Sequence, residues 1–184
     1  ITSDSATFGN FLKRNIGVRR YQSLTETGYD SYIYILNGDT PDKEIAAVNG
    51  YPKQKRLETL SDGKHFSLPL GDNSTLHTVL GGKQDILSII RGVSEVIETA
   101  FEEKRDSVAI IVGGDSQSPI KLSVFYHMIL FAVVHKIVQC SSEAFNPYYT
   151  FLIKEHEFGI FQSVINNLIK EEKPPRIQAT DRSS

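Results

Sequence analysis

The sequence lacks the features of a small secreted domain held together by disulfide bonds. Cys140 is the single cysteine among 184 residues, so no disulfide can form within the chain. This absence favours a reducing compartment, and we expect an intracellular, cytoplasmic protein. An excess of charge of one sign is missing too, because the formal net charge is −2. We therefore expect no broad electrostatic attraction to nucleic acid or to an anionic membrane.

Common nucleotide and metal motifs are missing as well. The sequence contains neither a Walker loop nor a Gly-x-Gly-x-x-Gly motif. Two of its histidines are spaced to share one helical face, but no paired carboxylate stands near them in sequence. We therefore expect no metal, no bound cofactor, and buried or surface histidines with structural roles. The five histidines are His65, His77, His127, His135 and His156.

Long hydrophobic runs are scarce. The longest apolar stretch covers residues 122–138 and is at the short limit for crossing a bilayer. It is interrupted by Tyr126, His127, His135 and Lys136. The stretch therefore predicts a buried helix in the core of a soluble domain, and no membrane partner is expected.

What the sequence does contain is the composition of one globular domain. Hydrophobic residues make up 40% and charged residues 23% of the chain. We expect a single domain over residues 1–172 and a disordered tail over residues 173–184, where prolines and polar residues replace the apolar pattern. The chain opens on Ile1 rather than on methionine, as expected of an excised or processed domain.

The first half of the chain reads mainly as short strands. Residues 18–24 and 31–36 are β-rich runs, and the turn-like residues 25–28 between them predict a hairpin. Thr40 and Pro41 can start a short helix that ends near residue 50, and a strand over residues 44–48 is the alternative.

A small meander of strands is expected next, over residues 55–60, 65–70 and 75–80. The Asp-Gly pair at residues 62–63 and the polar residues 71–74 are typical of the tight turns that such a meander needs.

The second half alternates between helices and strands. Apolar residues repeat at spacings of three and four over residues 83–105, which predicts an amphipathic helix. A strand over residues 108–113, a helix over 119–139, a strand over 148–153 and a final helix over 158–169 follow. Because this alternation implies crossovers, we expect a three-layer α/β/α domain with a mixed sheet.

The loop from Gly113 to Pro119 is the best candidate for a ligand site. It connects a buried strand to a helix, at the edge where open α/β sheets bind their ligands. Its glycines allow close approach of a ligand, its hydroxyl groups can donate hydrogen bonds, and the N-terminus of the next helix favours an anion. The alternative is a tight turn with a serine cap before Pro119. The candidate ligand residues here are Gly113, Gly114, Asp115, Ser116 and Ser118.

The same loop can also be interpreted as the turn that carries a catalytic serine. Ser116 follows a strand and precedes a helix, although the segment departs from Gly-x-Ser-x-Gly at its last position. A serine hydrolase also needs a histidine and an acid, and His156 with Glu155 or Glu157 can supply them. Nothing in their spacing requires that arrangement.

Four segments follow one another in a fixed order between residues 31 and 170. They are Asp62-Gly63-Lys64 before Leu68-Pro69-Leu70, then Thr78-Val79-Leu80-Gly81-Gly82, then the strand Ser107–Val112, and finally Tyr149–Glu155 before a closing helix. This order resembles that of macro-like domains, particularly the N-terminal domain of leucine aminopeptidases. The resemblance implies a macro-like α/β fold.

The resemblance also implies a ligand and residues that bind it. Macro-like domains that bind ADP-ribose place an aspartate near the adenine, and Asp39 matches it. Their second phosphate loop corresponds to residues 113–119. Their Asn-Ala-Ala-Asn-like segment is not kept, because residues 45–50 retain only Asn49 and one glycine. If the aminopeptidase likeness is the closer one, the catalytic domain with its metal ligands is absent, and the chain is an assembly or regulatory module.

Three functions follow in order. The first is a non-catalytic macro-like module that acts through binding or assembly, with a protein partner or self-association. The second is a module that binds a nucleotide or ADP-ribose through the Gly113–Ser118 loop and Asp39. The third is a serine hydrolase with Ser116 as its nucleophile.

Overall fold

The computed structural model describes residues 15–24, 28–71, 73–114, 120–140 and 145–171. Its strands are β1 (Ile16–Arg20), β2 (Ser31–Asn37), β3 (His65–Leu70), β4 (Ser74–Gly81), β5 (Ser107–Gly113) and β6 (Tyr148–Ile153). Its helices are α2 (Lys43–Ala46), α3 (Gln54–Leu57), α4 (Ile86–Glu102), α5 (Leu122–Cys140), the 3-10 turn η1 (Glu155–Glu157) and α6 (Phe158–Glu171).

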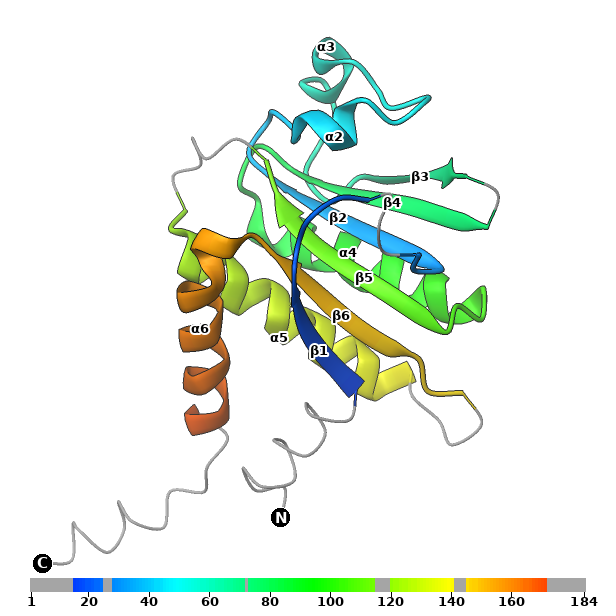
Figure 1. The fold of residues 1–184 in the computed structure, drawn as a ribbon. Helices are drawn as coiled ribbons and strands as arrows, with labels where there is room; N and C mark the ends of the chain where they lie inside the picture. The colour runs from blue at the N-terminus through cyan, green and yellow to red at the C-terminus, as the bar shows by residue number, and fades with distance from the viewer. Residues whose placement is uncertain (1–14, 25–27, 72, 115–119, 141–144, 172–184) are drawn as a thin grey trace, which may run out of the picture.

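The strands form one 6-stranded mixed sheet in the order β1-β6-β5-β2-β4-β3 (Figure 1). Every neighbouring pair is parallel except β3 and β4, which are antiparallel. Ser107 of β5 pairs with Tyr148 of β6 in a parallel register, as the alternation of strands and helices predicted. The predicted α/β class with a mixed sheet is confirmed.

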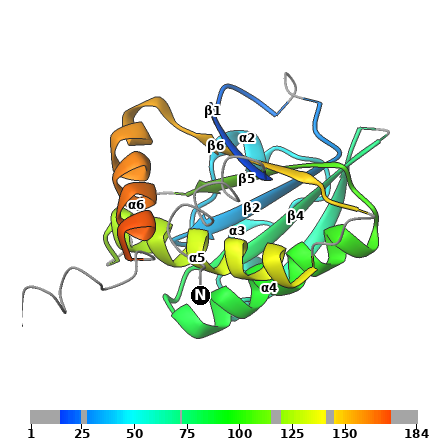
Figure 2. The ribbon, with the colours of Figure 1, turned by 90° about the horizontal axis from the view of Figure 1, so that it is seen from below.

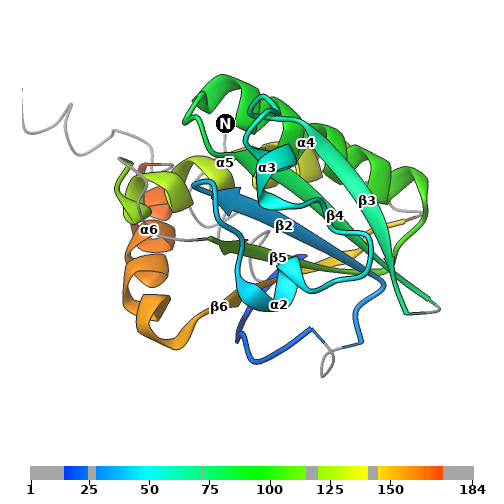
Figure 3. The same cartoon turned by 90° about the horizontal axis from the view of Figure 1, so that it is seen from above.

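Helices cover the two faces of the sheet unequally. The long helices α4, α5 and α6 lie together on one face (Figure 2). Ile33 and Ile35 of β2 point into the core on that side. The short helices α2 and α3 lie on the other face (Figure 3), where Ile45 and Leu57 pack against the tyrosines of β2. The second helical layer is therefore thin, and the loops around it form much of the cover.

Helix α5 has the sequence of a helix that is apolar nearly all round. Among the described residues it alone is long and apolar enough to cross a membrane by length and composition, with a mean hydropathy of 1.5. It packs between α4 and α6, and Phe125, Ile129 and Val133 are fully buried beneath it. Its place in the structure is that of a core helix.

Two predictions for the first half are wrong. β1 and β2 do not form a hairpin, because β1 pairs in parallel with β6 at one end of the sheet. All seven residues of β2 are buried, and β5 and β4 flank the strand on its two sides. Turn propensity is local and does not identify the partner of a strand. Residues 25–27 lie outside the described residues.

The predicted strand over residues 55–60 is also wrong, because helix α3 begins at Gln54 and ends at Leu57. The apolar residues Leu57 and Leu60 are three apart, which is the spacing of a helix rather than of a strand. Of the two interpretations of residues 40–50, the helix is correct. It starts after Asp42, however, and no side chain caps it.

Candidate functional site

The carboxyl ends of the parallel strands meet at one edge of the sheet. β2 ends at Asn37, β4 at Gly81, β5 at Gly113 and β6 at Ile153. In open α/β sheets this edge is where ligands bind, because the loops that leave it diverge. The loops after β2, β5 and β6 therefore form the first region in which to look for a site.

The two glycines at the end of β5 are required by packing within the protein. A Cβ atom on Gly113 would lie 2.2 Å from Asp42 Oδ2. Gly114 has a φ of +115°, and a Cβ atom there would lie 2.7 Å from the carbonyl oxygen of Asn37. These positions accept only glycine. On one side, the space beside Gly113 is filled by the protein's own carboxylate.

Asp42 is the centre of a polar cluster that joins β2 to β6 across the end of β5. Its Oδ1 is 3.1 Å from Lys154 Nζ, and its Oδ2 accepts a hydrogen bond of 3.2 Å from the hydroxyl of Tyr34. The Tyr34 hydroxyl in turn accepts from the Asp42 N–H at 3.0 Å. Burial, and after it the Asp42 charge, raises the pKa of Tyr34 far above its ordinary value. Tyr34 is therefore a fixed neutral donor.

A hollow of about 240 Å³ opens on the other side of the two glycines. We call it the Gly113 hollow. Its lining mixes the ends of β2 and β5 with the start of α5 and with the segment after β6. The lining residues are Asn37, Val112, Gly113, Gly114, Ile120, Lys121, Leu122, Lys154 and Glu157.

The charges of the Gly113 hollow favour an anion. Lys121 is exposed, and its side chain forms no hydrogen bond or ion pair with another described residue. Lys154 has one carboxylate partner, Asp42. The Oδ1 atom of Asn37 is buried and has no hydrogen-bond partner among the described residues. The hollow thus offers lysine ammonium groups beside the first turn of α5, whose N–H groups attract negative charge.

Glu157 is the single acidic side chain of the Gly113 hollow, and it is held by a neighbour. Its Oε1 accepts a hydrogen bond of 2.6 Å from the hydroxyl of Tyr126 on α5. Burial, and then this hydrogen bond, raises the pKa of Tyr126 well above its ordinary value. His156 Nε2 lies 3.5 Å from Glu157 Oε2, but the His156 side chain is 78% exposed. Glu157 therefore anchors α5 to the turn after β6.

A second hollow, of about 200 Å³, lies at the same edge on the β4 side. We call it the Asp39 hollow. Asp39 is exposed there, and its backbone carbonyl accepts a hydrogen bond of 2.6 Å from Gln54 Nε2. Lys83 Nζ donates to the carbonyl oxygens of Glu58 and Leu60, which closes the far wall. Leu36, Gly38, Leu57, Leu80 and Gly82 complete the lining.

The predicted ligand residues are partly brought together. Gly113 and Gly114 line one hollow and Asp39 lines the other, with the segment Asn37–Gly38 between them. Asn49 lies exposed in the turn after α2 and lines neither hollow. Asp115, Ser116 and Ser118 lie outside the described residues, as does the turn that they were predicted to form.

Sequence reasoning did not select Asn37, Lys121 or Lys154. One signal was available, because Asn37 and Lys154 directly end or follow strands that were predicted correctly. Polar residues at those positions face the same edge as the Gly113 loop.

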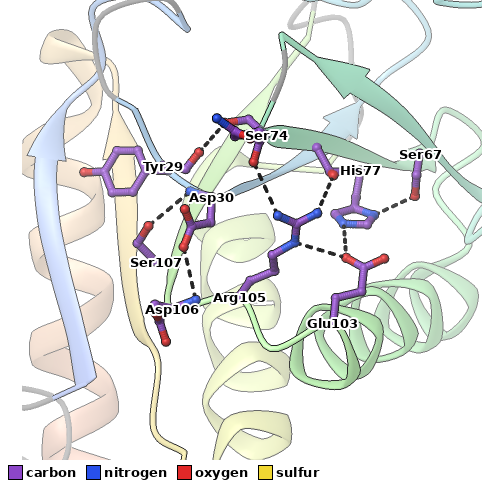
Figure 4. A network of polar contacts seen from close by, with 11 residues as sticks. Tyr29, Asp30, Ser67, Ser74, His77, Glu103, Arg105, Asp106 and Ser107 are labelled. Atoms are coloured by element: carbon purple, nitrogen blue, oxygen red, sulfur yellow. Dashed lines mark hydrogen bonds and ion pairs between the residues drawn. The ribbon is translucent and has the colours of Figure 1, made fainter.

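A separate polar network lies at the opposite edge of the sheet, around His77 (Figure 4). The Nδ1 atom of this buried histidine is 2.6 Å from Ser67 Oγ, and its Nε2 is 3.8 Å from Glu103 Oε1. Arg105 donates to Thr75 Oγ1 at 3.0 Å and lies 3.5 Å from Glu103. Burial lowers the pKa of His77, because it disfavours the charged form. This network connects β3, β4 and the end of α4.

Metal ligation finds no support in the part of the chain that the structure describes. No group of three or more histidine, cysteine, aspartate or glutamate side chains is close enough there to hold an ion. Cys140 ends α5, and burial raises the pKa of its thiol, which disfavours the reactive thiolate.

Comparison with known proteins identifies the fold. No protein-family model and no curated protein sequence matches the chain. Among solved structures, the macro domain of ganglioside induced differentiation associated protein 2 is similar with a TM-score of 0.59 and 16% sequence identity. The match covers 82% of this chain and 82% of that one.

Two further structures extend the comparison. The Trypanosoma brucei macrodomain in complex with ADP-ribose is similar with a TM-score of 0.60 and 12% identity, over 83% of this chain and 69% of that one. Tomato leucine aminopeptidase is similar with a TM-score of 0.50 and 11% identity, over 82% of this chain but 35% of the enzyme. At such identities these likenesses establish the fold alone. The chain has the macro-like α/β fold that the order of its segments predicted.

Proposed function

We propose that the chain is a non-catalytic binding module whose carboxyl edge takes an anionic nucleotide-type ligand, with ADP-ribose as the first candidate. The observation that carries the proposal is the Gly113 hollow, where Lys121 and Lys154 face the start of α5. A macrodomain of similar fold has been solved in complex with ADP-ribose. The fold and the charge of the hollow thus favour the same class of ligand.

The phosphate groups belong in the Gly113 hollow. Lys121 can bind a phosphate without losing another partner, because its side chain has none among the described residues. α5 is 19 residues long, so the partial positive charge at its N-terminus is fully developed. Asn37 adds a buried amide whose oxygen is unpaired and can accept a hydrogen bond from a ribose hydroxyl.

The base belongs in the Asp39 hollow. Leu36, Leu57 and Leu80 give this hollow apolar walls, and the Asp39 carboxylate can accept a hydrogen bond from an exocyclic amino group. The two hollows measure about 240 and 200 Å³. Sites for ligands of drug size usually have about 300–1,000 Å³. We therefore propose that one extended ligand spans both hollows across Gly38.

Titration with ADP-ribose, ADP and ribose 5-phosphate tests the proposal. ADP-ribose is expected to raise the melting temperature in a saturable manner, because it binds the folded state. Calorimetry on Lys121→Ala should show binding weakened by about tenfold, the usual effect of losing one charge-assisted contact. Lys55→Ala is the matched control, since Lys55 is exposed on α3 and lines neither hollow. No saturable response to any member of the panel would contradict the proposal.

Two other functions stay predictions. Assembly through a protein partner or through self-association is compatible with a binding module, and the oligomeric state measured by analytical ultracentrifugation tests it. No observation among the described residues favours a serine hydrolase, since Ser116 lies outside them. Ester hydrolysis that disappears in Ser116→Ala would support that function.

A further inference from the structure

The outer edge of the sheet at β3 has an open side. β3 is the last strand of the sheet and pairs with β4 alone among the described strands. The N–H of Leu80 donates to the carbonyl of Lys64 at 3.0 Å. Because hydrogen-bonded residues alternate along an antiparallel strand, His65 and Ser67 direct their backbone N–H and C=O groups to the open side. A row of backbone groups that can pair with another strand is therefore present.

A groove of about 500 Å³ lies against this edge, between β3 and the region around α3 (Figure 3). We call it the β3 groove. Its floor is apolar, formed by Leu60, Phe66 and Leu68, each of which is half-buried. The Phe66 ring packs edge-on against Tyr51 at 5.4 Å, which fixes the floor. Gly50, Pro52, Arg56, Lys64 and His65 complete the lining.

The rim of the β3 groove is basic. Arg56 and Lys64 are exposed, and neither side chain forms a hydrogen bond or ion pair with another described residue. His65 is different, because its Nε2 lies 3.0 Å from Glu95 Oε1. No acidic side chain lines the groove. Two unpartnered cations therefore stand over an apolar floor.

The geometry points to an extended acidic peptide as the ligand of the β3 groove, added to the sheet as a further strand beside β3. Backbone pairing with His65 and Ser67 would supply the contacts common to all such peptides. Lys64, Phe66 and Leu68 are alternate residues of one chain segment, so they share a face. A peptide with carboxylates and one apolar residue at alternate positions matches that face.

The length of the added strand is limited by Pro69. Pro69 is in register with Thr75, and its nitrogen carries no hydrogen for pairing on the open side. Prolines and basic residues are typical of sheet edges that are protected against uncontrolled pairing. We therefore infer a short and selective docking site that requires negative charge on the partner. It is independent of the ligand proposed for the carboxyl edge.

A capped peptide, acetyl-Glu-Thr-Leu-Thr-Glu-Thr-amide, is the probe for this site. The peptide places a glutamate on either side of the leucine, so it can pair in both directions. Titrated into the ¹⁵N-labelled protein, it should shift the amide signals of His65 and Ser67 in a saturable way. Arg56→Ala/Lys64→Ala should weaken its binding by about tenfold, the sum of two exposed charge pairs. Lys55→Ala, on the same helix but outside the groove, should bind as the parent protein does.

Two modified peptides separate strand addition from simple attraction of charge. The peptide with both glutamates replaced by glutamine should bind as weakly to the parent protein as the original peptide binds to the double variant. The peptide with N-methyl groups on its backbone keeps its charge but cannot pair with β3. Equal binding of the N-methylated peptide, or shifts at Gly113 and Gly114 in place of His65 and Ser67, would overturn the inference.

Discussion

At the scale of single residues, the two glycines after β5 show how one sequence feature can have two explanations. Sequence reasoning predicted that Gly113 and Gly114 admit a ligand. In the structure, Gly113 first of all admits Asp42, and Gly114 admits the backbone of Asn37. A hollow nevertheless remains on their other side. The glycines are thus structural, and the charges of Lys121 and Lys154 give the hollow its chemistry.

Substitution of Gly113 by alanine should lower the free energy of unfolding by about 1–3 kcal/mol, because the new methyl group would collide with Asp42 and Tyr34. Gly159→Ala is the matched control. A Cβ atom on Gly159, in the first turn of α6, meets no atom within 4 Å. That variant should gain up to about 1 kcal/mol from helix propensity. Urea unfolding of both variants checks this, and equal effects would contradict it.

His77 should make the stability of the protein fall in mild acid. Burial lowers its pKa in the folded state, so the unfolded chain binds a proton that the folded chain does not. The contribution of neutral His77 is thus complete above the unfolded pKa, about 6.5, and is lost below it. The charges that face it are Glu103, which opposes the shift, and Arg105 and His65, which increase it.

Urea unfolding at about pH 7.5 and about pH 5.5 measures this dependence. The fall in stability should be smaller in His77→Asn, which keeps a polar group toward Ser67 but does not titrate there. His156→Gln, which removes an exposed histidine, should keep the parent's dependence. A parent-like fall in His77→Asn would assign the effect to other groups.

At the scale of elements, the connection between β4 and α4 depends on a carboxylate from a distant turn. Asp62 is buried, and its two oxygens accept hydrogen bonds from the N–H groups of Lys83 and Asp85, at 2.8 and 2.6 Å. The Asp-Gly pair at 62–63 was predicted to make a hairpin. It instead fixes the start of α4, where Asp85 caps the helix by accepting from Ser88 N–H.

Asp62→Asn should therefore destabilise the protein by roughly 1–3 kcal/mol, because an amide nitrogen cannot accept the bond that one carboxylate oxygen accepts now. Asp39→Asn removes the same charge from an exposed position and should change stability by less than about 0.5 kcal/mol. Thermal unfolding of the two variants under identical conditions gives the comparison. Similar melting temperatures would show that the connection does not depend on Asp62.

Elements with a strong repeat were predictable from the sequence, and their pairing was not. α4, β5, α5, β6 and α6 follow the predicted ranges because their apolar residues repeat at helical spacing or form short buried runs. The position of β1 beside β6 depends on contacts between distant segments, which no local pattern contains. α3 was mistaken for a strand because one short helical turn leaves few apolar positions to compare.

At the scale of the whole molecule, the two proposed sites lie at different edges of one sheet. The carboxyl edge combines hollows, lysines and a helix N-terminus, and β3 offers backbone groups beside a basic groove. The candidate residues that the sequence suggested, Asp39, Gly113 and Gly114, belong to the first edge. The second edge had no motif, because α3 and β3 had to be placed in space before Arg56 and Lys64 shared a groove.

The amide spectrum of the ¹⁵N-labelled protein during titration with ADP-ribose tests the ligand site at the carboxyl edge most directly. Binding there should shift the signals of Gly38, Gly114 and Leu122 in a saturable way, and it should leave those of His65 and Ser67 in place. Saturable binding that leaves Gly38 and Gly114 unchanged would contradict the site, and no shift at all would contradict the ligand.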